Sequence, residues 1–398
     1  MDLRISARGC TLFAMLQILI CVAVIASSGC LSTGEPVNET PAGETPFLNE
    51  SVNASSVKIT ESATPANHLP EIVPAEISGD PYEDRTFNVK FEKSEYELVL
   101  PVNLSVYYGA KSADKSITEG TLWKETEKVS EYYRSFFEGD AIEGFYTDIL
   151  KKIRHIMIAE GFSDEEYLEF LMTFVQQIPY DSEAESPRFP VEVVYDMKGD
   201  CDEKSMLLIG LLAREGYDTA LIIFPEYHHA TTGIRIITSS DTSFRQFKSE
   251  DGRKYVFIES TDLSYIGQYP GYYEDAYAVV IPIGDGNKTF ERYNYVSYIT
   301  ESLTKIANRI LFFQSELNRL YDEIKSLESD LNGAKSYDSD SEWQKDHTRY
   351  INLIDDYYEY EDLISRNIEV YNYVIEHPYD IAGVRRYIYN SKVNEIEY

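Results

Sequence analysis

The sequence predicts a protein of the α+β class that ends in an antiparallel helical hairpin. Short apolar segments alternate within residues 86–108, which favours two antiparallel strands. Helical periodicity follows from about Leu122 to Glu160, and the last hundred residues carry a heptad repeat. With 398 residues, of which 43% are hydrophobic and 13% aromatic, the chain can build one large domain or two to three smaller ones.

The first 30 residues have the features of an export signal. Arg4 and Arg8 precede an apolar run from Thr11 to Ala26, which is short for a spanning helix. The following Ser-Ser-Gly-Cys resembles the end of a lipobox, in which the cysteine, here Cys30, becomes the lipidated first residue of the mature chain. We therefore expect a lipoprotein anchored on the extracellular face of the membrane. An uncleaved signal anchor would give the same location.

Residues 31–78 are rich in Thr, Glu, Pro, Ser and Asn and show no apolar periodicity. Such a composition cannot bury enough apolar surface to offset the entropy lost on ordering, so we expect a flexible stalk. Three glycosylation sequons begin at Asn38, Asn49 and Asn53, which fits an exported chain.

Acidic residues outnumber basic ones by 68 to 36, so the formal net charge is −32. This surplus repels nucleic acid and anionic lipid headgroups, because binding a polyanion draws on exposed Lys and Arg. The composition therefore predicts no nucleic-acid partner and a well-hydrated surface.

Cys201 is the single cysteine outside the first thirty residues. An exported body with one cysteine cannot form an internal disulfide, and a lone thiol outside the cell is open to oxidation. Either Cys201 is buried and inert, or its reactivity is the reason for its presence.

Cys201 lies at the predicted start of a buried helix. Asp200 and Glu203 stand at capping positions, the apolar run 206–212 follows, and Gly216 is a helix stop. Free backbone amides and the helix dipole at such a start stabilise an anion, so we expect this thiol to titrate below the free value of about 8.5. Taken alone, a cysteine of this kind is more often part of the core.

The segments that follow contain the other parts of a thiol triad. Residues 217–224, 231–237 and 254–259 read as strands. His228 and His229 precede the second strand, and Glu259 closes the third. In such a triad the histidine takes the thiol proton and later protonates the leaving group, while the acid orients the imidazole.

Four segments together resemble the transglutaminase-like superfamily, most closely its archaeal and bacterial members: Phe174–Tyr180 (FVQQIPY), Gly199–Ser205 (GDCDEKS), His229–Ile234 (HATTGI) and Phe257–Thr261 (FIEST). The resemblance covers roughly residues 85–290. It implies a papain-like α+β fold with the cysteine helix packed on an antiparallel sheet. It also implies acyl transfer from glutamine side chains or peptide bonds through a thioester, to an amine or to water.

The resemblance assigns roles to single residues. Cys201 matches the nucleophile, and His229 matches the base better than its neighbour does, because Gly233 follows it by four residues. Glu259 stands where the family usually has aspartate, and Asp262 is the alternative third member. Either carboxylate can orient an imidazole.

Gln176 or Gln177 could complete an oxyanion hole with the backbone amide of Cys201. We expect no metal and no cofactor, because adjacent histidines on a strand face opposite ways and the chain has no glycine-rich phosphate loop or calcium loop. The calcium dependence of animal relatives has no support in this sequence.

Apolar residues in the last hundred positions repeat at intervals of three and four. The first seam comprises Leu303, Ile306, Ile310, Phe313, Leu317, Leu320, Ile324, Leu327 and Leu331, and the second runs from Trp343 to Ile375 with Glu361 as its one lapse. The polar break between them predicts a hairpin over residues 299–398, beside an enzyme-like domain over 79–298. The hairpin could brace that domain, self-associate or bind a partner.

These features predict a surface-anchored cysteine enzyme that acts on peptide or glutamine amide bonds of protein or peptide substrates. Hydrolysis and transfer stay open, because the same thioester precedes both. The alternative is a non-catalytic surface scaffold that binds partners through its C-terminal helices.

Overall fold

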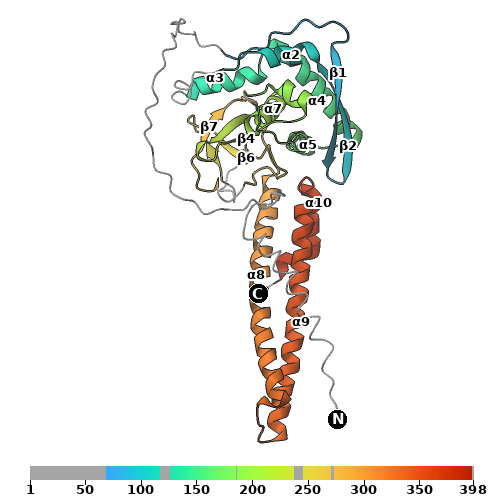
Figure 1. Cartoon of the computed structure of the whole chain (residues 1–398), viewed down its shortest axis with the longest axis vertical. Helices are drawn as coiled ribbons and strands as arrows, with labels where there is room; N and C mark the ends of the chain where they lie inside the picture. Colours follow the sequence, from blue (N-terminus) through green and yellow to red (C-terminus); the bar gives the residue numbers. More distant parts are fainter. Residues whose placement is uncertain (1–68, 117–125, 185, 237–244, 270–272, 397–398) are drawn as a thin grey trace, which may run out of the picture. The chain divides into compact units, whose positions relative to one another are not determined.

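The computed structural model describes residues 69–116, 126–184, 186–236, 245–269 and 273–396 (Figure 1). The expected export signal and the expected stalk up to residue 68 lie outside these ranges. Leu69–Tyr398 form one compact unit. Among the described helices, none is long and apolar enough to cross a membrane.

The described chain combines helices with antiparallel sheets and ends in a helical region, as the α+β prediction requires. Strands β1 (Tyr82–Phe91) and β2 (Ser94–Asn103) pair antiparallel, as the apolar alternation predicted, but β1 begins before residue 86 and the residues after Asn103 are helical rather than extended. One face of this pair is buried, and the Phe87 ring meets the edge of Phe174 at a centroid distance of 5.2 Å.

The ordered body begins before residue 79, the predicted boundary. Ile72 belongs to the hydrophobic core, and the backbone N–H of Ala75 donates to Ser105 O at 2.9 Å. Gly109 allows this approach, because a Cβ there would collide with the carbonyl of Val73. The last residues of the expected stalk therefore pack against the globular part.

Between β2 and the central sheet the described chain forms these helices, in chain order: α2 (Leu104–Ser112), α3 (Thr126–Phe137), α4 (Asp140–Glu160), α5 (Asp164–Gln176), α6 (Pro190–Asp196) and α7 (Cys201–Arg214). The single periodic stretch predicted over 122–160 is in fact two helices, α3 and α4. Gly139, with φ of 121°, separates them in a conformation that glycine adopts readily. The capping box predicted at Ser163 and Glu166 opens α5.

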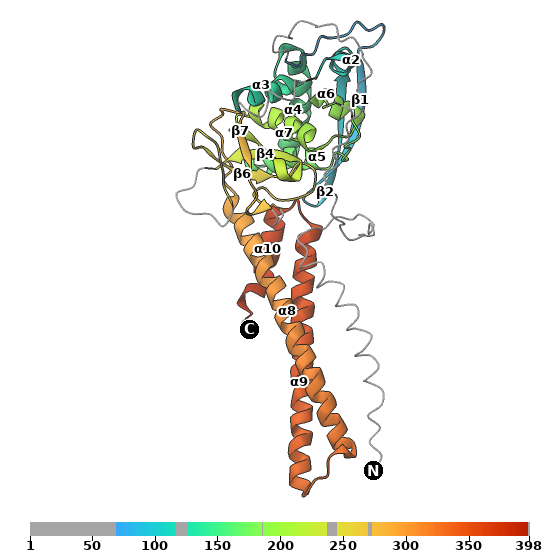
Figure 2. The ribbon, with the colours of Figure 1, turned by 60° about the vertical axis from the view of Figure 1, so that its left-hand side comes forward.

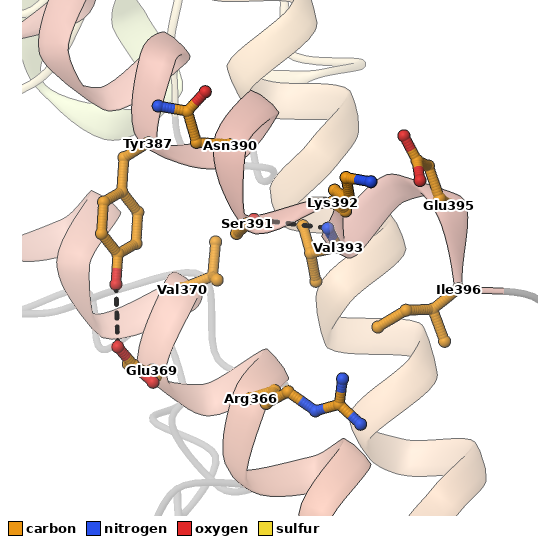
Figure 3. Close-up of a pocket in the computed structure, with 10 residues that line it drawn as sticks. All are labelled: Arg366, Glu369, Val370, Tyr387, Asn390, Ser391, Lys392, Val393, Glu395 and Ile396. Atoms are coloured by element: carbon orange, nitrogen blue, oxygen red, sulfur yellow. Dashed lines mark hydrogen bonds between the residues drawn. The ribbon is translucent and has the colours of Figure 1, made fainter.

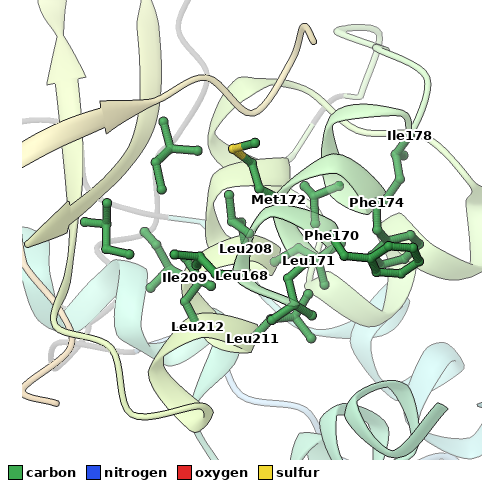
Figure 4. Packing of buried hydrophobic residues seen from close by; sticks show 14 of the residues in the cluster. Leu168, Phe170, Leu171, Met172, Phe174, Ile178, Leu208, Ile209, Leu211 and Leu212 are labelled. Atoms are coloured by element: carbon green, nitrogen blue, oxygen red, sulfur yellow. The ribbon is translucent and has the colours of Figure 1, made fainter. Parts of the chain in front are cut away.

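Helix α7 is the centre of the fold. It packs against α5 on one side and against the central sheet on the other. Figure 4 shows Leu168 and Met172 of α5 beside Leu208 and Ile209 of α7, all fully or almost fully buried. The apolar run after Cys201 thus holds the helix rigidly within the core, with its first residue at the edge.

The central sheet has the order β5-β6-β4-β3-β7, and all its neighbouring strands are antiparallel. Its strands are β3 (Thr219–Phe224), β4 (His229–Arg235), β5 (Phe247–Lys248), β6 (Lys254–Ile258) and β7 (Val279–Pro282). One face, with Val256 and Ile258, joins the main core. The other face, with Phe224 and Phe257, forms a second apolar cluster.

The C-terminal region is built on two long antiparallel helices, α8 (Tyr293–Ser329) and α9 (Asp340–Glu376), which run side by side in both views (Figures 1 and 2). A turn containing Gly333, with φ of 107°, connects them. Helix α10 (Ile381–Ser391) packs beside both. Helix α8 begins at Tyr293, before the predicted boundary at residue 299.

The buried seam of α9 differs in part from the predicted one. Tyr350, Tyr357 and Ile364 are buried as expected, but Leu353 and Val370 are buried in place of Ile354 and Tyr371. A strict heptad drifts around a straight helix of 3.6 residues per turn, and α10 covers an additional face. The periodicity therefore predicted the hairpin but not every buried position.

The base of the hairpin shares the core of the globular part. Val296 and Ile299 of α8 and Val384 of α10 belong to the same buried cluster as the residues of α5 and α7. The hydroxyl of Tyr265 donates to the carbonyl of His377, at the end of α9, over 2.9 Å. These contacts join the base of the hairpin to the globular part.

Candidate active site

A capping box places Cys201 as the first residue of α7. Asp200 is the N-cap residue, and its carboxylate accepts a hydrogen bond from Glu203 N at 3.0 Å. Glu203 Oε2 in turn accepts one from Asp200 N at 3.0 Å. This reciprocal pair satisfies free amides of the first turn and sets the direction in which α7 enters the core.

Glu203 also ties this helix start to the preceding loop. Its carboxylate is fully buried and accepts from Arg188 Nη1 at 2.9 Å. The same guanidinium reaches Asp181 at 2.5 Å. Because a buried charge is tolerated only with a partner, Arg188 and Glu203 each require the other.

Lys204 fixes the other side of the helix start. Its side chain is buried, and Nζ donates to the carbonyls of Ile178 at 2.6 Å and Gln176 at 3.2 Å. These carbonyls lie at and just after the C-terminal end of α5, where a cation is favoured by the helix dipole. The residues around Cys201 thus join α7 to α5 and to the loop that ends at Arg188.

His229, the first residue of β4, lies against Glu259, which follows β6. The imidazole Nε2 is 3.3 Å from Glu259 Oε2. Nε2 is buried and makes no well-aligned hydrogen bond, so this is a close contact between the imidazole and the carboxylate. Burial alone would raise the pKa of Glu259, but the contact with His229 and hydrogen bonds from Thr261 outweigh it and lower that pKa. Glu259 is therefore a carboxylate at neutral pH.

The Cys201 thiol lies at the same end of β4 as the imidazole. Its Sγ is 4.0 Å from the carbonyl oxygen of His228, and the backbone N–H of Ala230 is close enough to favour the thiolate and so to lower the pKa of the thiol. These two residues flank His229 in the chain. The imidazole Nε2 faces Glu259, so Nδ1 is the ring nitrogen that this carboxylate does not contact.

The thiol of Cys201 does not have the low pKa that its place at a helix start predicts. Burial raises its pKa to about 12, and the carboxylates of Asp202 and Asp200 add to the effect. Asp202 Oδ1 is 4.0 Å from the sulfur. The hydrogen bond from Ala230 opposes the rise but is outweighed. Desolvation and neighbouring negative charge thus overcome the helix dipole.

The alternatives to His229 and Glu259 lie elsewhere. The His228 side chain is exposed, and its backbone adopts a left-handed conformation with φ of 48°. Asp262 is exposed as well. Among the residues that the structure describes, Glu259 is the carboxylate within ion-pair distance of the His229 ring.

Neither predicted oxyanion glutamine is free for that role. Gln176 Nε2 donates to the carbonyls of Glu259 at 2.8 Å and Ser264 at 3.2 Å. Gln177 Nε2 donates to the carbonyl of Lys90 at 2.8 Å. Both amides are committed to backbone carbonyls, so the backbone N–H of Cys201 is the remaining donor of the expected pair.

Two aromatic rings hold the imidazole of His229, and sequence analysis missed both. Tyr273 stacks on it with a centroid distance of 5.6 Å and an interplanar angle of 13°, and Phe224 stacks at 6.4 Å and 23°. Tyr273 comes from the loop after β6, and no local pattern connects it to His229. The stacking limits rotation of the ring.

The carboxylates of Asp200 and Asp202 and the sulfur of Cys201 lie within 4.8 Å of one another. In the described part of the chain this is the group whose spacing would suit a cation.

Two pockets lie apart from Cys201, His229 and Glu259. One, of about 580 Å³, is lined by α9, α10 and the turn after α10, with Arg366, Tyr387 and Lys392 in its wall (Figure 3). The other, of about 480 Å³, contains Lys115 and Arg188. Neither is lined by Cys201, His229 or Glu259.

Comparisons with known proteins found no family model, no curated protein and no solved structure that matches this chain. The functional argument therefore depends on the contacts among Cys201, His229 and Glu259.

Proposed function

We propose that this chain is a transglutaminase-like cysteine enzyme with a papain-like core, which acts on peptide or glutamine amide bonds through a thioester. The observation that carries the proposal is the contact of both neighbours of His229, His228 O and Ala230 N–H, with the Cys201 sulfur, while Nε2 of the ring faces Glu259. These contacts support an order of nucleophile, base and acid of the kind that thiol acyl transfer uses.

The raised pKa of Cys201 determines how the reaction would begin. The resting thiol is protonated at neutral pH, so His229 acts as a general base at the moment of attack. The sulfur bonds to the amide carbon while the imidazole takes the thiol proton. The backbone N–H of Cys201 stabilises the resulting oxyanion.

Collapse of this intermediate breaks the C–N bond, and His229 returns the proton to the leaving amine. The acyl group is then a thioester on Cys201. Water or an amine attacks its carbonyl carbon, again giving a proton to His229, and the sulfur leaves as the thiol. Glu259 stays ionised throughout and stabilises the imidazolium.

Mass spectrometry of the protein with a peptide-amide library tests this function. We expect acyl adducts on Cys201 and converted peptides, both absent in Cys201→Ala. A library that stays unchanged, with no adduct on Cys201 across pH 6 to 9, would overturn the proposal.

A non-catalytic scaffold is the second candidate, because a half-buried thiol with a pKa of about 12 is a poor resting nucleophile. In that case the exposed apolar residues of the hairpin, such as Leu311 and Ile351, would contact a partner. It predicts a folded protein in which His229→Ala leaves the reactivity of Cys201 unchanged.

The expected anchoring at Cys30 belongs to the same proposal, and that residue lies outside the described ranges. An exported, lipid-anchored enzyme would meet proteins or peptides at the cell surface. Mass analysis of the mature N-terminus tests this point independently of activity, with Cys30→Ala as the variant expected to lose the lipid.

A further inference from the structure

We propose that Gln176 is a positioning residue that holds the acid of the triad, Glu259, against His229. This inference rests on the proposed function and assigns a role to a residue that does not touch the thiol. Gln176 is the last residue of α5 and is only 4% exposed. Its amide nitrogen donates to the carbonyl of Glu259 at 2.8 Å and to that of Ser264 at 3.2 Å.

The backbone of Glu259 needs this support because the sheet ends one residue before it. The pairing of β4 with β6 stops at Thr232 and Ile258. The carbonyl of Glu259 is therefore beyond the ladder, and the Gln176 amide takes the place of a strand partner. An unsatisfied buried carbonyl would be costly, so the bond holds the chain in one place.

The position of this backbone decides where the carboxylate lies. Glu259 Oε1 accepts from the N–H groups of Ser260 and Thr261, each at 2.9 Å, and from the Thr261 hydroxyl at 2.6 Å. The carboxylate is thus fastened to its own loop, and its other oxygen points to His229. A shift of the loop carries the carboxylate with it.

Gln176 is itself held in place. Lys204, three residues after Cys201, donates to the Gln176 carbonyl. Helix α7, which carries the thiol, therefore also holds Gln176 in place. On its far side the same loop is held by the bond from Tyr265 to His377 at the base of the hairpin. The loop after β6, which contains Glu259 and Tyr265, is therefore held between α5 and the end of α9.

Gln177 provides a matched control. Its amide also bonds backbone carbonyls, those of Lys90 and Thr173, but these lie on β1 and within α5, away from the triad. Gln176→Met and Gln177→Met each remove an amide of similar size. If Gln176 served only the fold, the two variants would behave alike.

The experiment measures acylation of Cys201 by p-nitrophenyl acetate, from nitrophenolate release and from the acetyl adduct, in the full chain. We expect Gln176→Met to react tenfold or more slowly than wild type, since a misplacement of about 1 Å in such a site costs up to roughly 10²-fold. Gln177→Met should react as wild type does. Circular dichroism and urea unfolding compare the stability of the two variants.

A double-mutant cycle with Glu259→Gln separates positioning from general destabilisation. If Gln176 acts through Glu259, the double variant reacts no more slowly than Glu259→Gln alone. Additive losses, or wild-type rates in Gln176→Met, would overturn the inference. Should Gln176→Met fail to fold, Gln176→Asn keeps an amide but is one methylene too short to reach the carbonyl of Glu259, and it undergoes the same cycle.

If the proposed function is wrong, the acylation rates show a different pattern. Wild type and His229→Ala would then react at equal rates, and the inference would fall with the function it rests on. A wild type faster than His229→Ala, beside an unaffected Gln176→Met, rejects the positioning role alone.

Discussion

The imidazole Nε2 of His229 lies 3.3 Å from Oε2 of Glu259, while the other oxygen of that carboxylate is held by Ser260 and Thr261. This arrangement brings together the start of β4 and the residue after β6, thirty positions apart in the chain. It gives the imidazole a defined orientation, with Nε2 toward the carboxylate of Glu259.

Replacing the acid should slow any reaction that uses His229. In Glu259→Gln the amide keeps the size of the side chain but loses the charge that stabilises an imidazolium. We expect acylation of Cys201 to fall by roughly 10²-fold or more. Asp262→Asn, at the exposed alternative acid, should stay close to wild type. Equal losses in the two variants would contradict the assignment.

Removing the charge beside the thiol should make the thiol more acidic. Asp202 raises the pKa of Cys201, so Asp202→Asn favours the thiolate and moves the pH profile of iodoacetamide alkylation to lower pH. Asp164→Asn, at the exposed start of α5, is the control and should leave the profile unchanged. A profile that moves upward in Asp202→Asn would show that the carboxylate instead helps the thiolate.

Glu169 should make the fold less stable as the pH rises. Its side chain is 3% exposed, and burial raises its pKa to about 8 despite the guanidinium of Arg292 at 3.3 Å; Glu165, Glu166 and Glu92 also face it. Between the ordinary carboxyl value of 4.5 and about pH 8, the folded state holds a proton that the unfolded chain has released. Stability therefore falls with rising pH across this window.

Glu169→Gln should remove that part of the slope. The measurement is the free energy of unfolding in urea at several values between pH 5 and 9, compared with wild type. Glu301→Gln, at an exposed position of α8, should keep the wild-type slope. An unchanged slope in Glu169→Gln would mean that Glu169 is ionised in the folded state.

Two helical glycines should respond to alanine in opposite ways. At Gly210 in α7 a Cβ would collide with the hydroxyl of the buried Tyr146, so Gly210→Ala should destabilise the fold by roughly 1–3 kcal/mol. At Gly144 in α4 the added Cβ meets nothing within 4 Å, so Gly144→Ala should stabilise it by roughly 0.5–1 kcal/mol. Urea unfolding measures both. A stabilising Gly210→Ala would show that the Tyr146 side chain moves aside at little energetic cost.

Local features of the fold could be predicted because their partners are close in sequence. The capping boxes at Ser163 and Asp200 each join residues three positions apart, and the strand pair within 86–108 has a short connection. The helical hairpin could be predicted from the heptad spacing of its apolar residues. Helices α2 and α6 were missed, since nine and seven residues are too few for a clear periodicity.

The sequence by itself determined which residues could react: a lone cysteine at a helix start, a histidine before a strand and an acid after another. Only the tertiary structure decided that His229 and Glu259 meet, that Gln176 supports the acid and that the thiol of Cys201 is held protonated. The reason is physical. Capping depends on neighbours along the chain, whereas distance, burial and the pKa depend on the groups that folding brings around a side chain.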